Sequence, residues 1–177
     1  MEIYLIRHTT PVLSPGLIYG KLEVPLSPTF NDELEIIKSK LPDGLDRVFS
    51  SPSSRCTKLS KEIDPDFQID TRLTELDFGD WEGAAWDTVD QDALQIWMND
   101  FVNERVPGGE SMMQMHGRVN EFRNDLLQMN YKRVGVVTHA GVIRLMLAIV
   151  RKTPLDQLFQ IQVNYGDVVS CQLTGNA

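Results

Sequence analysis

The first eleven residues of the chain read Met1-Glu2-Ile3-Tyr4-Leu5-Ile6-Arg7-His8-Thr9-Thr10-Pro11. Residues 3–6 form a short apolar run that is typical of a buried strand, and Pro11 ends the run. Arg7 and His8 follow it directly, so two polar groups that are costly to bury stand at the carboxyl end of a strand. Ligands of open α/β sheets bind at that edge. The stretch therefore predicts a sheet with a binding site after its first strand.

Two further segments repeat this arrangement. Residues 134–138 are predicted to form a strand, and His139-Ala140-Gly141 opens the helix that follows. Arg55 is expected in the first turn of a helix after a strand at residues 47–50. If the three strands are neighbours, their carboxyl ends meet where helix N-termini favour a phosphate. Four side chains are then expected to converge at this edge: Arg7, His8, Arg55 and His139.

Two of these residues also have simpler explanations when each is taken alone. Arg55 fits a solvated arginine on a helix face, and His139 fits a histidine that caps a helix and is satisfied by backbone groups. The joint occurrence of the four residues at matching positions favours the phosphate site over these explanations.

The order of the elements predicts the fold class. Strand, helix, strand, helix and strand are expected up to residue 70, with Asn31 capping the first helix, residues 51–54 capping the second, and residues 67–70 forming the third strand. This order implies right-handed crossovers and a mostly parallel sheet. We predict an α/β protein with a three-layer α/β/α sandwich. No repeat or linker divides the chain, so residues 1–177 are expected to form a single domain.

The alternation of strands and helices is expected to be interrupted at the start of the second half of the chain. Residues from about 77 to 110 contain all three tryptophans and many acids, and are expected to form short helices in a lid-like insertion over the sheet edge. Ser111 and Gln114 predict a capping box at the start of a long amphipathic helix. A buried helix over residues 142–150 follows the 134–138 strand. Residues 159–163 and 168–173 are expected to form a closing pair of strands.

Composition limits the kinds of partner. The formal net charge of −8 argues against binding a polyanion such as nucleic acid, although a small anion can still bind where cations gather in a pocket. No apolar run is long enough to span a membrane, and the N-terminus lacks the features of a secretory signal. Only two cysteines occur, Cys56 and Cys171, which suits a reducing cytoplasm, with one disulfide left open. The sequence does not predict an oligomeric state.

Several known site motifs are absent. The third histidine, His116, has no partners at zinc-ligand spacing, and the Walker, Gly-x-Gly-x-x-Gly and Gly-x-Ser-x-Gly motifs do not occur. Neither a metal nor a cofactor is expected. The pattern that is left is metal-free nucleophilic catalysis on phosphate.

Such chemistry needs an acid for the leaving oxygen, and residues 73–83 supply candidates. Glu75 follows the predicted third strand between leucines, and partial burial, with Trp81 as a possible cover, favours a protonated carboxyl there. The alternative for Glu75 is a carboxylate that caps the next helix. Three other acids of this segment are expected in loops or caps: Asp77, Asp80 and Glu82.

Several motifs resemble those of the histidine phosphatase superfamily, which has the phosphoglycerate mutase-like fold. Residues 5–9 (Leu-Ile-Arg-His-Thr) resemble its Arg-His motif, and residues 50–56 resemble its second-arginine motif. Residues 73–83 are similar to its acid motif, 107–111 to a further family segment and 137–142 to its second-histidine motif. The motifs run in the family's order over nearly the whole chain. Within the superfamily, the chain most resembles α-ribazole phosphatases of cobalamin biosynthesis.

The resemblance implies a role for each residue. His8 is expected to be the nucleophile that becomes a phosphohistidine, and Glu75 the acid and then the base. Three groups are expected to hold the phosphoryl oxygens: Arg7, Arg55 and His139. Five further positions are expected to contact substrate: Thr9, Ser14, Tyr19, Gly20 and Ala140. The implied substrate is a small phosphate monoester such as α-ribazole 5′-phosphate.

Departures from the family pattern leave the substrate open. Thr9 and Ala140 stand where glycine is common, and Lys21 and Glu23 replace more usual polar residues near the pocket mouth. Aromatic and methionine side chains near the site either favour a flat base or are ordinary packing: Tyr19, Trp81, Trp86, Met112 and Met113. The alternatives are a phosphoglycerate mutase, a broad-specificity sugar or nucleotide phosphatase, and a non-catalytic phosphate-binding module.

Overall fold

The computed structural model describes residues 1–175 and contains a five-stranded sheet in the order β3-β2-β4-β1-β5. Strands β1, β2, β3 and β4 run parallel to one another, and β5 is antiparallel to β1. The strands are β1 (Glu2–Arg7), β2 (Arg47–Ser50), β3 (Gln68–Ile69), β4 (Arg133–Thr138) and β5 (Val168–Gln172). The α-helices are α1 (Phe30–Ser39), α2 (Ser54–Ile63), α3 (Gln91–Asn99), α4 (Met112–Gln128) and α5 (Ala140–Arg151). The short 3-10 helices are η1 (Thr71–Leu73), η2 (Gly79–Trp81) and η3 (Leu155–Gln160).

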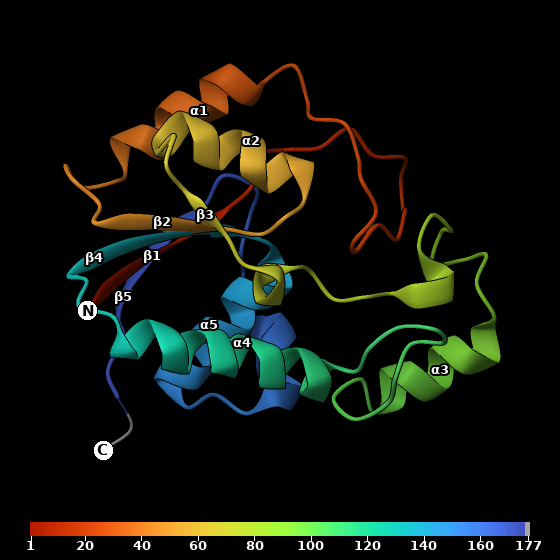
Figure 1. Ribbon diagram of the computed structural model, residues 1–177. Helices are drawn as coiled ribbons and strands as arrows, with labels where there is room; N and C mark the ends of the chain where they lie inside the picture. The colour runs from red at the N-terminus through yellow and green to blue at the C-terminus, as the bar shows by residue number, and fades with distance from the viewer. Residues whose placement is uncertain (176–177) are drawn as a thin grey trace.

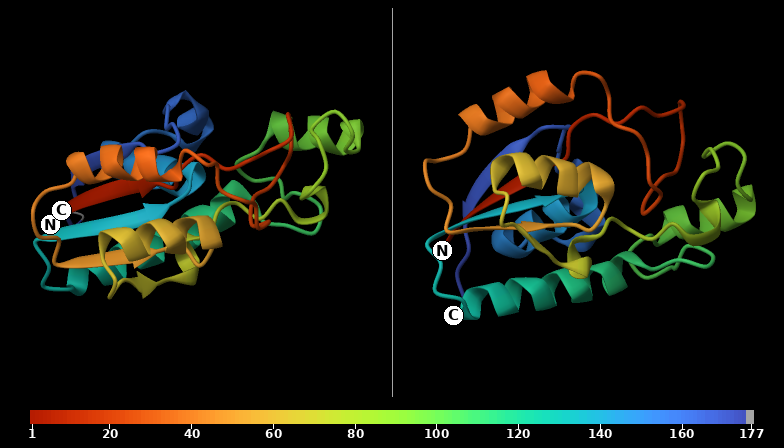
Figure 2. Two further views of the ribbon diagram at one scale, coloured as in Figure 1. Left: turned by 90° about the horizontal axis from the view of Figure 1, so that it is seen from above. Right: turned by 45° about the horizontal axis from the view of Figure 1, so that its top comes forward.

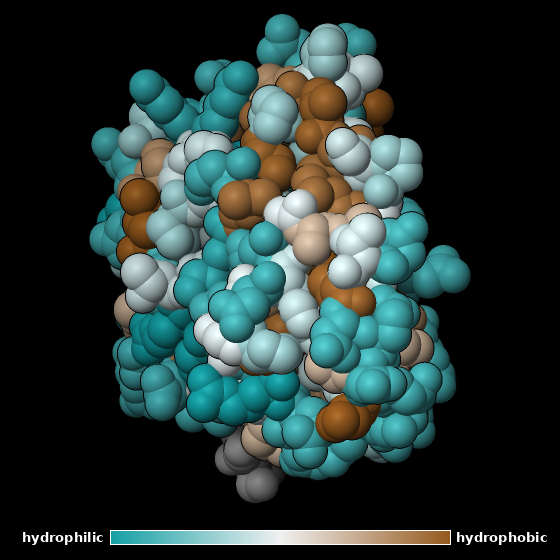
Figure 3. Space-filling view, turned by 90° about the vertical axis from the view of Figure 1, so that its right-hand side faces the viewer, coloured by the Kyte–Doolittle hydropathy of each residue, from teal (hydrophilic) through white to brown (hydrophobic). Residues whose placement is uncertain are grey.

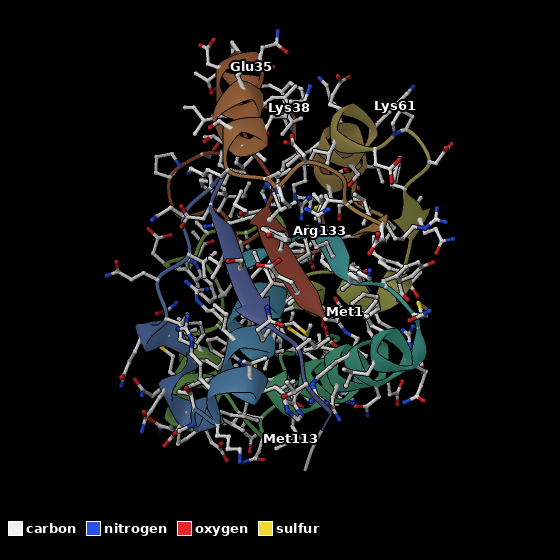
Figure 4. The ribbon with its side chains drawn as sticks, turned by 90° about the vertical axis from the view of Figure 1, so that its left-hand side faces the viewer. Met1, Glu35, Lys38, Lys61, Met113 and Arg133 are labelled. Carbon is white, nitrogen blue, oxygen red and sulfur yellow. The ribbon has the colours of Figure 1, made fainter. Side chains whose placement is uncertain are left out.

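The elements form three layers, as the sequence predicts. Helices α1 and α2 cover one face of the sheet, and α4 and α5 cover the other (Figure 1). Each face has its own apolar core. Ile6, Val48 and Val137 pack with α1 and α2, whereas Ile3, Leu5 and many residues of α4 and α5 form the larger core on the other side. Glu35 and Lys38 are exposed and point away from the sheet on α1 (Figure 4).

The strand order places the predicted site strands together. Strand β4 lies between β1 and β2, so the carboxyl ends of these three strands meet at one edge. Figure 2 shows them running in the same direction, with the 77–110 segment beyond their carboxyl ends.

The capping box of α4 is present as predicted: Ser111 accepts from the Gln114 N–H, and Gln114 accepts from the Ser111 N–H.

Residues 77–110 hold η2, α3 and a set of packed rings that we call the aromatic cluster: Phe78, Trp81, Trp86, Trp97 and Phe101. The rings of Trp86 and Trp97 stack with centroids 6.0 Å apart. The loop after β1 pairs with this segment, because the Ile18 N–H donates to the Ala84 carbonyl over 2.9 Å. In Figure 3, apolar surface is gathered on the upper part of the face formed by these two segments. The proposed lid-like role of residues 77–110 stays a prediction.

Three sequence predictions about local structure are wrong. Helix α1 begins at Phe30 with Thr29 as its cap, not at Asn31, because Phe30 is buried in the core and joins the helix. Strand β3 is shorter than predicted, with two residues, both exposed. Residues 159–163 form no strand. Residues 159–160 end η3 instead, and the carbonyls of Ile161 and Val163 accept from arginine side chains rather than from a neighbouring strand.

Candidate active site

His8 lies directly after β1 and is almost fully buried, with 1% of its surface exposed. Its backbone N–H donates to the Thr138 carbonyl at the end of β4, over 3.1 Å. Its ring Nδ1 lies 2.8 Å from the Thr9 carbonyl. Because a carbonyl can only accept, Nδ1 carries the hydrogen and Nε2 keeps a lone pair. Burial, with smaller contributions from the Arg55 and Arg7 charges, lowers the pKa of His8 to about 3, so the ring is a neutral base at pH 7.

His139 caps α5 at the end of β4, and its ring centroid lies 5.2 Å from that of His8. Its Nδ1 faces Arg55 Nη2 at 3.4 Å, and its Nε2 lies 2.8 Å from Ser51 Oγ. Since a guanidinium can only donate, Nε2 carries the hydrogen and donates to Ser51. Burial first, and then repulsion from His8 when it is protonated and from the arginines, lowers the pKa of His139 well below its ordinary value. Both rings are therefore neutral and held in fixed orientations.

Arg7 and Arg55 supply positive charge without an acidic partner. Arg55 is fully buried, and its guanidinium donates to the Leu22 carbonyl over 2.8 Å and to the Gly20 carbonyl over 2.6 Å. Arg7 Nη1 donates to the Val163 carbonyl over 2.8 Å. Among residues 1–175, neither arginine forms an ion pair, and the Nε of each has no hydrogen-bond partner. Cations that are buried or half-buried and form no ion pair favour the binding of an anion.

Glu75 reaches the same place from the segment after η1. Its Oε2 accepts from the Gly141 N–H over 3.2 Å, in the first turn of α5, and its Oε1 accepts from the Leu76 N–H over 3.0 Å. A Cβ at Gly141 would lie 2.2 Å from Glu75 Oε1, so only glycine permits this approach. Glu75 lines a cavity of about 530 Å³, whose other lining residues include Lys21, Glu23 and Arg118. The carboxyl therefore lies between the N-terminus of α5 and a cavity whose lining includes several charged side chains.

The structure brings most of the other predicted contact residues to this edge. Thr9 is fully buried, and its Oγ1 has no hydrogen-bond partner among residues 1–175. Gly20 has a φ of +23°, and its carbonyl holds Arg55. The Tyr19 ring lies 5.3 Å from the Arg55 guanidinium carbon, and Ala140 is the first residue of α5. Ser14 is the exception: its side chain is exposed, and its carbonyl accepts from the Leu17 N–H.

The sequence reasoning missed two residues of the site. Ser51 orients His139, and its position directly after β2 matches that of His8 after β1, so this signal was available. Tyr165 had no such signal, because residues 164–167 were expected to be a turn between two strands. The guanidinium carbon of Arg7 lies 3.7 Å from the centroid of the Tyr165 ring. The Tyr165 hydroxyl lies 2.8 Å from that of Tyr19.

Other candidate groups take no part in this cluster of side chains. Trp81 and Trp86 pack in the aromatic cluster and Met112 is buried, so the packing explanation of these residues is the correct one. Cys56 and Cys171 are both free. Within residues 1–175, no three His, Cys, Asp or Glu side chains are grouped so that they could hold a metal ion, and no helix there is long and apolar enough to cross a membrane.

The two buried histidines give the protein a specific pH dependence of stability. Their folded pKa values lie below the unfolded value of about 6.5, so the unfolded chain binds more protons in acid and stability falls with falling pH. Between about pH 6 and 4.5, each histidine is expected to lower the free energy of unfolding by about 1.4 kcal/mol for every unit that the pH falls. Urea unfolding at several pH values measures this slope, and His139→Asn is expected to lower it by about half. An unchanged slope would contradict the burial of His139 as a neutral group.

The edge of a mostly parallel sheet here presents a neutral histidine pair, two arginines without acidic partners and a nearby carboxyl. This combination defines a class of protein: an enzyme that handles phosphoryl groups. The comparison with protein families agrees with this class. The model of the histidine phosphatase superfamily (branch 1) matches residues 3–177, and the chain belongs to this family. It is a phosphatase with the phosphoglycerate mutase-like fold.

Individual relatives carry several names. The adenosylcobalamin/alpha-ribazole phosphatase of Escherichia coli is 27% identical over 94% of this chain and 87% of its own length. Phosphoserine phosphatase 1 of Hydrogenobacter thermophilus is 25% identical over 82% of this chain and 74% of its own length. The crystal structure of the alpha-ribazole phosphatase from Shigella flexneri superposes with a TM-score of 0.86 at 25% identity, covering 96% of this chain and 89% of that one.

Proposed function

We propose that the protein hydrolyses a small phosphate monoester through a phosphohistidine at His8. The observation that carries this proposal is the state of the His8 ring. The Thr9 carbonyl fixes the hydrogen on Nδ1, and burial keeps the ring unprotonated, which leaves Nε2 as a nucleophile at neutral pH. Arg7 and Arg55 have no acidic partners and are available to stabilise the charge of the transferring group.

The reaction proceeds in two displacements. In the first, His8 Nε2 forms a bond to phosphorus as the ester P–O bond breaks, and Glu75 gives its proton to the leaving oxygen. In the second, Glu75 takes a proton from water as the water oxygen attacks phosphorus, the P–N bond breaks, and phosphate and neutral His8 are released. Glu75 is held for both steps by the Gly141 N–H, and it faces the cavity from which water and the leaving group exchange.

The substrate that we propose first is α-ribazole 5′-phosphate. The names of relatives at 25–27% identity support it. The aromatic rings of Tyr19 and Tyr165 also support it, because they lie beside the two arginines and place aromatic surface next to the site. The tryptophans give no such support, since they pack in the aromatic cluster.

One observation favours a second candidate, an ester that carries a carboxylate, such as phosphoserine. Arg144 lies one turn along α5 from Gly141, and its Nε donates to the Ile161 carbonyl over 2.9 Å. No acid pairs with it among the described residues. Burial lowers the pKa of Arg144, and the charges of Glu75 and Arg7 act on it as well, which puts this cation near the acid. A carboxylate on the leaving group could pair with Arg144.

A panel of substrates decides between these candidates. The purified protein is expected to release phosphate from α-ribazole 5′-phosphate with kcat/KM about 10- to 200-fold above that for nucleoside monophosphates, sugar phosphates and phosphoserine, the range that one or two pocket contacts supply. A higher value for phosphoserine would favour the carboxylate ester instead. Isomer formation from phosphoglycerate without release of phosphate would indicate a mutase. No turnover even of para-nitrophenyl phosphate would indicate a phosphate-binding module.

A further inference from the structure

Three of the groups expected to meet the phosphoryl group are almost completely buried. His8 and His139 each expose 1% of their surface, and Arg55 exposes none. In-line attack requires phosphorus to lie within contact distance of a nucleophile. A substrate therefore reaches His8 only if part of its enclosure moves.

Two segments far apart in sequence form that enclosure. One is the loop of residues 9–29, whose Gly20 and Leu22 carbonyls hold Arg55 and whose Tyr19 ring lies near the same guanidinium. The other is the stretch of residues 161–167, which we call the C-terminal strap. Figure 1 shows that both lie at the edge where the parallel strands end.

The C-terminal strap is held by groups of the site itself. Arg7 Nη1 donates to the Val163 carbonyl, and the Gly166 N–H donates to the His8 carbonyl over 3.2 Å. Between these two anchors, the Tyr165 ring lies against Arg7 and has its centroid 5.5 Å from that of His8. The ring therefore covers the nucleophile from the side of the strap.

The 9–29 loop and the strap are joined at one point. Among the hydrogen bonds of residues 1–175, only the one between the Tyr19 and Tyr165 hydroxyls, over 2.8 Å, links residues 9–29 to residues 161–167. Burial and this bond raise the pKa of Tyr19, so its hydroxyl stays protonated and either phenol can donate. A bond between two neutral hydroxyls at the surface of a site is weak enough to open thermally.

We propose that Tyr19 and Tyr165 form a gate over His8, which is closed by the bond between their hydroxyls and must open before an ester can reach Nε2. With the gate open, both hydroxyls are released next to Arg7 and Arg55 and can donate to the entering phosphoryl group. Tyr165 thereby becomes a residue that controls access and positions Arg7. The gate depends on the proposed function in one respect only: the claim that the molecule passing it is a phosphate ester.

The gate is tested without substrate, by the rate at which diethyl pyrocarbonate modifies His8, followed by peptide mass spectrometry. Tyr19→Phe and Tyr165→Phe each remove the hydroxyl bond and keep the ring. Each is expected to raise the rate at His8 about 2- to 12-fold, which corresponds to a net hydrogen bond of about 0.5–1.5 kcal/mol. Because both substitutions break the same bond, the double variant is expected to match the single variants rather than to multiply their effects.

Two controls separate the gate from a general loosening of the fold. His116 in α4 lines a different cavity, and its rate is expected to stay constant in every variant. Tyr131→Phe removes a phenol hydroxyl near the start of β4, at the opposite edge of the sheet, and is expected to leave the His8 rate unchanged. Equal His8 rates in wild type and in both single variants would overturn the gate, as would rates that multiply in the double variant. A protein that never forms phosphohistidine but shows the expected rates would refute the proposed function and leave the gate standing.

Discussion

Replacement of His8 by alanine is expected to lower kcat for phosphate release by about 10⁴-fold or more, because the covalent route is lost and only binding and charge stabilisation remain. With ³²P-labelled substrate, the wild-type protein is expected to carry a label that is labile in acid and stable in base, and His8→Ala is expected to carry none. The measurement is single-turnover quenching followed by gel separation of the labelled protein.

The matched control is His116→Ala. His116 is half-buried in α4 and lines a separate cavity, so its removal is expected to leave both turnover and labelling near the wild-type level. Circular dichroism and the unfolding midpoint must show that His8→Ala still folds, since a buried ring has been removed. A label that survives in folded His8→Ala would refute the phosphohistidine at this position.

Glu75→Gln is expected to have the second largest effect, a loss of about 10²- to 10⁴-fold in kcat for an alkyl phosphate. Glutamine keeps an acceptor oxygen for the Gly141 N–H, but its amide can act neither as a general acid nor as a general base. With para-nitrophenyl phosphate the leaving group needs no proton, so the first displacement remains fast. The second displacement still lacks its base, and a burst of nitrophenol equal to the amount of enzyme is expected, with phosphoenzyme accumulating behind it.

Glu82→Gln is the matched control for this substitution. The Glu82 carboxylate accepts from the Lys21 and Phe78 N–H groups, and glutamine can replace it in both bonds. Turnover is expected to change by no more than a few-fold. If Glu82→Gln and Glu75→Gln lose activity equally with the alkyl phosphate, or if Glu75→Gln shows no burst, the assignment of acid and base to Glu75 is wrong.

The sequence predicted the layered α/β architecture and the site edge because both depend on short-range signals. Apolar runs of four residues mark β1 and β4, the pair Val48-Phe49 marks β2, and the crossover helices between them oblige the strands to run parallel. Parallel strands place their carboxyl ends together, so Arg7, His8 and His139 had to meet once these three strands were neighbours. The prediction failed at residues 159–163, where alternating apolar residues resemble a strand. There, the backbone carbonyls bond to arginine side chains that are distant in the sequence, and not to a neighbouring strand.

The sequence by itself determined which chemical groups stand at the ends of the strands. Strand direction and the polar residue after each apolar run both depend on residues that are close together in the sequence. Only the tertiary structure decided how those groups are held. The hydrogen on His8 Nδ1, the orientation of His139 by Ser51, and the approach of Glu75 to Gly141 each depend on which acceptor or glycine lies across the site. The Tyr19–Tyr165 contact joins residues 146 positions apart, so no local pattern encodes it. Closure of the site over His8 follows from that contact and from the burial that surrounds it.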